Sequence, residues 1–230
     1  MTAPSARSIS TLYKKVAFPN TQRVLASGVH HFDQIMSILV TREIISKAAH
    51  FAAQVTPTVG TPGKGYRDAA QHNLQKIHHD HFISKVGEEA VKTVFESFGR
   101  VVRGPDYRVY RGKAKSWASD LLVNGVGLAV KTQTAKNAAR YGLSWTFQAG
   151  ERRYDPILRQ PDAWVCFVEY NEVRQRCVVY PPYQIRALTF GEPKLERLKT
   201  SKKVLYAASL PAVNGANKLL GTSHKRKSLG

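Results

Sequence analysis

Asp120 and Lys131 are the two residues of this sequence whose types and spacing best suit catalysis. Both lie in the stretch SDLLVNGVGLAVKTQ, residues 119–133, which is typical of two short strands joined by a tight turn. Asn124-Gly125 predicts a type I′ hairpin turn, because that turn needs positive φ at both central residues. The resulting register places Asp120 opposite Ala129, and strand alternation puts Lys131 on the same face. The pairs expected across the turn are Val123 with Val126, Leu122 with Gly127, and Leu121 with Leu128.

A helical stretch upstream of this hairpin supplies further carboxylates. Residues 67–99 have a helical pattern, with a break expected near His81 and an end at Gly99. Glu88 lies at helical spacing from apolar residues, so we expect it to face inward. Glu89 lies on the same face as several charged residues, so we expect it to be at the surface, and it is the alternative to Glu88 as the inward acid.

These three motifs resemble those of the PD-(D/E)XK nuclease superfamily, which has the restriction-endonuclease-like fold. The resemblance rests on SD at 119–120, AVK at 129–131 and the helical GEEAV at 87–91. It covers about residues 80–185. It implies an α/β core made of a helix, a mixed β-sheet of about five strands and a flanking helix.

The resemblance also implies roles for individual residues. Asp120 would be the central ligand of Mg²⁺ (or Mn²⁺), and position 129 would hold a second carboxylate. Lys131 would position the attacking water or offset negative charge in the transition state. Three further residues would complete the site: Glu88 and the carbonyl of Val130 on the metal, and Gln133 on the scissile phosphate or on a base. Such a metal polarises a phosphoryl oxygen and lowers the pKa of bound water.

The alanine at position 129 has three explanations that the sequence leaves open. In the first explanation, an experimenter replaced the acid to inactivate the protein. In the second, the acid has moved to another element, with Glu151 or Glu169 reaching the site. In the third, the domain is a natural one that binds without cutting. We favour the first, because Asp120, Lys131 and Glu88 are kept together.

The charge of the chain indicates a polyanionic partner. Its 230 residues contain 35 Lys+Arg against 16 Asp+Glu, a formal net charge of +19, which favours double-stranded DNA. The basic segment before the hairpin and three later arginines are the expected phosphate contacts: Arg100, Arg103, Arg108, Arg111, Lys113, Lys115, Arg140, Arg152 and Arg153. No apolar run is long enough to span a membrane, and the two cysteines favour a reducing compartment.

The pattern along the chain predicts three regions. Residues 1–66 form a basic helical extension that ends in the linker TPTVGTPGKG, residues 67–190 form the nuclease core, and residues 191–230 form a basic C-terminal segment. We expect the helical pattern of the extension to cover VHHFDQIMSILVTREIISKAAHFAAQV. In the core, YGLSWTFQ, AWVCFVEY and RCVVYPP are expected to be strands.

Together these features predict a Mg²⁺-dependent DNA endonuclease of the homing or phage type, inactive here because of Ala129. We expect a cytoplasmic homodimer, in a bacterium or a phage-infected host cell. The alternatives are a non-catalytic DNA-binding protein on the same fold and a Holliday-junction resolvase.

Overall fold

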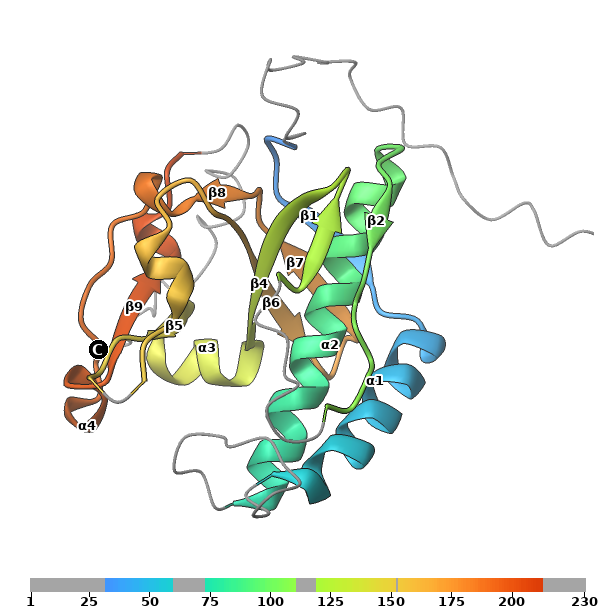
Figure 1. Cartoon of the computed structure of the whole chain (residues 1–230), viewed down its shortest axis with the longest axis horizontal. Coiled ribbons are helices and arrows are strands. Elements are labelled where there is room, and N and C mark those ends of the chain that lie inside the picture. Colours follow the sequence, from blue (N-terminus) through green and yellow to red (C-terminus); the bar gives the residue numbers. More distant parts are fainter. Residues whose placement is uncertain (1–31, 60–72, 111–118, 152, 213–230) are drawn as a thin grey trace, which may run out of the picture. The chain divides into compact units, whose positions relative to one another are not determined.

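The computed structural model describes residues 32–59, 73–110, 119–151 and 153–212 (Figure 1). Its helices are α1 (Arg42–Val55), α2 (Leu74–Ser97), α3 (Ala135–Tyr141) and α4 (Glu196–Lys199). Its strands are β1 (Met36–Leu39), β2 (Val102–Arg103), β3 (Leu121–Val123), β4 (Val126–Thr134), β5 (Ser144–Gln148), β6 (Trp164–Asn171), β7 (Arg176–Val179), β8 (Tyr183–Gln184) and β9 (Lys202–Tyr206). Short 3₁₀ turns include η3 (Pro156–Arg159) and η4 (Ile185–Ala187). The α/β class expected from the sequence is confirmed.

The main sheet is mixed and has the order β1-β7-β6-β4-β3-β2, with β8 also pairing with β6. Strands β4 and β6 are parallel, and the other pairs in this sheet are antiparallel. The expected number of about five strands is therefore too low. Strand β5 pairs with β9 in a second, two-stranded sheet, so YGLSWTFQ does form a strand, but one outside the main sheet.

The hairpin between β3 and β4 has the register that the Asn-Gly turn predicts. Leu121 pairs with Leu128, Leu122 with Gly127, and Val123 with Val126. Asn124 and Gly125 both have positive φ, 48° and 83°, as a type I′ turn requires. The two-residue turn thus fixes which side chains of β4 lie beside Asp120.

Helix α2 is continuous from Leu74 to Ser97, so the break expected near His81 is wrong. Its first turn is capped by Asn73, whose side chain accepts a hydrogen bond from the Lys76 amide at 3.0 Å. The chain leaves the helix at Gly99, where φ is 72°, a conformation that glycine adopts without steric cost. The helix is long enough to run across several strands of the sheet (Figure 1).

The helical interpretation of Met36–Leu39 is wrong, because these residues form β1 at the edge of the main sheet. They pair antiparallel with β7, Met36 opposite Val179 and Leu39 opposite Arg176. Helix α1 begins only after Thr41, whose hydroxyl accepts a hydrogen bond from the Ile44 amide at 3.3 Å. Pairing with β7 therefore overrides a helical pattern in a short apolar run, a run that periodicity alone cannot assign. Helix α1 packs on α2.

Two hydrophobic clusters lie on opposite faces of the sheet. On one face α2 covers Leu121, Leu128, Val130 and Val168. On the other face Trp145, Phe147 and Leu205 of the second sheet pack with Val165 and Phe167 of β6. None of the helices within the described ranges is both long and apolar enough to cross a membrane.

Helix α2 lies close against β4 at Gly87. A Cβ atom placed on this glycine would lie 1.9 Å from Oγ1 of Thr132. That distance is far inside van der Waals contact, so only glycine fits here. The Thr132 hydroxyl is buried and makes no hydrogen bond within the described residues.

We predict that Gly87→Ala destabilises the protein by about 1–3 kcal/mol, because overpacking forces the helix away from the strand. Urea denaturation measures the free energy of unfolding. Thr132→Ala removes Oγ1, the closest atom at 1.9 Å, and Cγ2, so the double variant Gly87→Ala/Thr132→Ala should regain most of the loss. Equal losses in the single Gly87 variant and the double variant would show that this contact is not what limits the packing.

Candidate functional site

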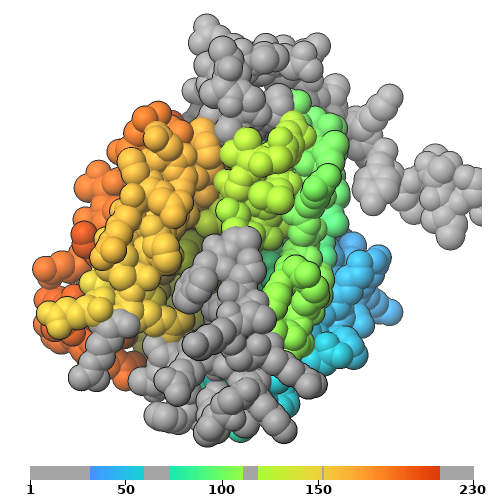
Figure 2. Space-filling view, in the orientation of Figure 1, coloured from blue at the N-terminus to red at the C-terminus, as the bar shows by residue number. Residues whose placement is uncertain are grey.

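A cavity of about 510 Å³ opens between α2, the hairpin and the segment that follows β5. Figure 2 shows this face, where the yellow-orange residues after β5 and the yellow-green residues of the β3–β4 hairpin stand on either side of a hollow. Five residues of the cavity wall bear on the predicted chemistry: Glu88, Asp120, Ala129, Lys131 and Asp155. The cavity therefore brings together Glu88, Asp120, Ala129 and Lys131, as the sequence predicts, and adds one acid.

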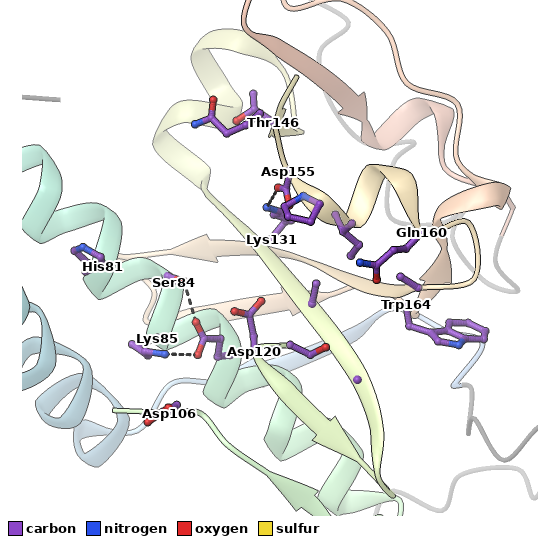
Figure 3. Close-up of a pocket in the computed structure, with 18 of the residues that line it drawn as sticks. His81, Ser84, Lys85, Asp106, Asp120, Lys131, Thr146, Asp155, Gln160 and Trp164 are labelled. Carbon is purple, nitrogen blue, oxygen red and sulfur yellow. Dashed lines mark hydrogen bonds and ion pairs between the residues drawn. The ribbon is translucent and has the colours of Figure 1, made fainter. Parts of the chain in front are cut away.

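Asp120 lies immediately before β3, and its side chain points toward β4 (Figure 3). Its Oδ2 accepts a hydrogen bond from the backbone amide of Val130 at 2.8 Å. Burial raises the pKa of this carboxyl, while the Val130 amide and nearby Lys131 act in the opposite direction. This hydrogen bond from the Val130 amide shows that the hairpin register sets the orientation of the Asp120 side chain.

Glu88 is only 2% exposed and faces the cavity from α2. Ser84 donates a hydrogen bond to its Oε1 at 2.9 Å, and Lys85 Nζ lies 2.6 Å from its Oε2; Figure 3 draws both interactions as dashed lines. Burial and the negative charge of Asp120 raise the pKa of Glu88 to about 7, against the opposing effect of Lys85. Placing a second carboxylate beside Asp120 is thus electrostatically costly.

Glu89 is buried, at 8% exposure, so the expectation of a surface position is wrong. Tyr107 donates a hydrogen bond from its hydroxyl to Glu89 Oε1 at 2.9 Å. Burial and the carboxylate of Glu89 raise the pKa of Tyr107. The segment after β2 covers this acid, and such a long-range contact is not visible in helical periodicity.

Lys131 projects from β4 into the cavity and forms an ion pair with Asp155. Its Nζ lies 2.6 Å from Asp155 Oδ2, and both side chains are partly buried, at 28% and 19% exposure. The same nitrogen lies 4.8 Å from the centre of the Phe147 ring, a distance that suits a cation–π contact. Lys131 is therefore held in place from two directions, and Figure 3 shows the ion pair with Asp155.

Asp155 lines the candidate site, and its place there is not predicted from the sequence. It directly precedes Pro156 and the 3₁₀ turn η3, and its amide donates to the carbonyl of Gln148 at 2.9 Å. Its side chain does not cap η3 and is directed to Lys131 instead. An acid before a proline is a common turn signal, so the sequence contained a signal for a turn here but none for proximity to Lys131.

The two acids considered as replacements for residue 129 do not line this cavity. Glu151 is exposed, and Glu169 lies on β6 beside Gln133. Gln133 is also outside the cavity wall. Its Oε1 accepts a hydrogen bond from the Ser144 amide at 2.9 Å, so it fastens β4 to the start of β5. The expected contact of Gln133 with a phosphate stays a prediction, while its observed contact is structural.

The expected phosphate-binding residues are spread over several surroundings. Arg108 and Arg153 line the cavity, and Arg108 forms an ion pair with Asp106 at 2.9 Å that holds the pKa of Asp106 well below its usual range.

Among the described residues, the other expected phosphate contacts do not line this cavity. Arg103 is exposed on β2. Arg140 lies 5.1 Å from the Tyr141 ring. Nε of Arg100 is buried and makes no hydrogen bond within the described residues. Four other candidates lie outside the described residues: Arg111, Lys113, Lys115 and Arg152.

The side chains present suit a hard divalent cation held by two carboxylates. Within the described ranges, no group of three or more His, Cys, Asp or Glu side chains is placed to hold a metal ion. Asp120 and Glu88 are close enough for the charge of Asp120 to raise the pKa of Glu88, and a cation between them would remove that repulsion. Mg²⁺ commonly takes only one or two carboxylates and keeps several waters, so this donor set fits it.

Comparisons with family models, with curated proteins and with solved structures each find no match to this chain.

We predict that the substitution Glu88→Gln is more stabilising at about pH 8 than at about pH 5. The change that it causes in the free energy of unfolding should differ by roughly 3 kcal/mol between the two pH values. The pKa of Glu88 rises from its ordinary 4.5 to about 7 on folding. Between these values the unfolded chain has released the proton and the native protein has not, so the stability that Glu88 contributes falls as the pH rises. Urea denaturation across this range measures it.

Glu96→Gln is the matched control, because the Glu96 side chain lies on the same helix and is 49% exposed. Its stability should follow the pH dependence of the unaltered protein. Glu88→Gln showing that same pH dependence would mean that Glu88 does not titrate as its burial requires.

Proposed function

We propose that this protein is a metal-dependent nuclease that hydrolyses phosphodiester bonds of DNA in the cavity around Ala129. The observation that carries the proposal is the convergence of Asp120, Glu88 and Lys131 on one cavity. The helix, hairpin, connecting segment and further strands also occur in the order that the resemblance to PD-(D/E)XK nucleases implies. The net charge of +19 supports a polyanionic substrate.

Each side chain has a distinct part in this proposal. Asp120 and Glu88 would hold Mg²⁺ or Mn²⁺, which when bound supplies Lewis-acid polarisation of the phosphate and a more acidic water. The Val130 amide keeps Asp120 oriented, and Ser84 and Lys85 do the same for Glu88. Lys131 offsets the negative charge that develops on the phosphate oxygens.

Two carboxylates take the place of an acid at residue 129 in this proposal. Glu88 supplies the second metal ligand, and a further acid must neutralise and orient the Lys131 ammonium group. Asp155 does so from the turn before η3, with a 2.6 Å ion pair. Position 129 is then free to be a small residue, and Ala129 packs partly into the cluster that contains Phe147 and Phe167. The alanine thus fits a native site with a relocated acid.

We predict that the unaltered chain cleaves DNA with Mg²⁺ or Mn²⁺, and that Asp120→Asn abolishes cleavage. Asp155→Asn should reduce the rate at least about tenfold, since Lys131 loses its partner and about 1.4 kcal/mol or more of transition-state stabilisation goes with it. The measurement is gel analysis of plasmid, junction and single-stranded DNA. The control is Asp162→Asn, an exposed acid paired with Arg186, which should cleave like the unaltered chain.

The variant Ala129→Glu distinguishes two hypotheses. In one, the acid has moved to another element and the site is intact; in the other, the acid at residue 129 has been lost and the site is inactive. An inactive unaltered chain together with an active Ala129→Glu variant would show that the acid belongs at 129 and that Asp155 does not replace it. The absence of cleavage by both proteins, on every DNA form and with either metal, would overturn the nuclease proposal and favour DNA binding without catalysis.

A further inference from the structure

We propose that a second cavity, next to the first, is a groove that binds a single strand of DNA. The inference rests on the proposed function, because it gives the path of the strand whose phosphate is cut. The second cavity has a volume of about 680 Å³ and lies between α2, the end of β4, β5 and the segment from Pro193 to Tyr206.

The two cavities meet at the candidate catalytic residues. Both are lined by Ser84, Asp120, Lys131, Thr146 and Lys202. A chain molecule with one phosphate at Lys131 therefore has room on both sides of that phosphate. A small substrate would need only the first cavity, so the arrangement suits a polymer that passes through.

The charge of the second cavity suits phosphates. Five cationic side chains line it, Lys76, Lys131, Lys194, Arg197 and Lys202, against two acids, Asp80 and Asp120. Asp80 is already paired with Lys76 at 2.6 Å. The wall formed by Lys194, Arg197 and Lys202 contributes cations only, and none of these three was among the expected phosphate contacts.

The aromatic residues of the groove favour an unpaired strand over a duplex. Tyr141 and Tyr206 line the second cavity and are partly exposed, and Tyr154 and Trp164 do the same in the first. Cations accompany these rings, with Lys194 Nζ 5.8 Å from the Tyr206 ring and Arg159 4.5 Å from the Tyr154 ring. Basic grooves with aromatic side chains on which bases stack are typical of single-strand binding, whereas bases in a duplex stack on one another.

Fluorescence anisotropy of a labelled 20-nucleotide strand, in EDTA so that no cleavage occurs, tests the groove. The expected result is tighter binding of the single strand than of its duplex.

Two variants test the side chains of the groove. The double variant Lys194→Gln/Arg197→Gln should weaken single-strand binding at least about tenfold. It should also reduce the slope of the logarithm of the binding constant against log[salt] by about 1.4, since each lost phosphate contact removes about 0.7. Tyr141→Leu should weaken binding about fivefold or more with the slope unchanged.

Arg174→Gln/Lys203→Gln is the matched control. It removes the same charge from exposed side chains that line neither cavity, so it should change binding little. Equal weakening of binding in the control and in the Lys194/Arg197 variant would overturn the proposal that the second cavity binds DNA. Unchanged binding by the Lys194/Arg197 variant would overturn it as well. Tighter binding of the duplex, with Tyr141→Leu binding like the unaltered chain, would overturn the single-strand assignment. Metal-dependent cleavage can persist in each of these cases, so the proposed function is tested separately.

Discussion

The contact between Gly87 of α2 and Thr132 of β4 is the constraint on which the rest of the site depends. With no side chain at residue 87, the helix lies directly on the strand. The next helical residue, Glu88, is thereby brought into the same cavity as Asp120. A helix held further from the sheet by a single methyl group would move its carboxylate away from the hairpin. Backbone proximity therefore determines which side chains meet.

The closeness of these carboxylates has an electrostatic cost that the fold only partly offsets. Lys85 neutralises Glu88 from within α2, and the Val130 amide stabilises Asp120 from within the hairpin. Burial nevertheless raises the pKa of both acids. Strongly perturbed pKa values of this kind are concentrated at functional sites, although structural ion pairs also produce them. A bound cation would relieve the remaining repulsion between the two groups.

The sequence was sufficient for the parts of the site that depend on local chemistry. The Asn-Gly turn determines the β3–β4 register by its own φ requirement, and helical periodicity places Glu88 inward. It was insufficient where pairing between distant segments decides the outcome. Met36–Leu39 is a strand because β7 offers it a partner, and Glu89 is buried because Tyr107 covers it. Periodicity within a segment carries no information on such partners.

Ala129 is the clearest case in which the neighbouring sequence does not reveal which side chains meet in the fold. Seen in the hairpin alone, it is a gap between Asp120 and Lys131, and the natural inference is a missing acid. Seen in the fold, the ammonium of Lys131 already has a carboxylate partner, Asp155, which is 24 residues further along the chain. An ion pair needs opposite charges at short distance and is indifferent to their order in the sequence. A site of this kind is therefore defined by the groups that surround Lys131, and a substitution beside it in sequence does not by itself mean that the site is lost.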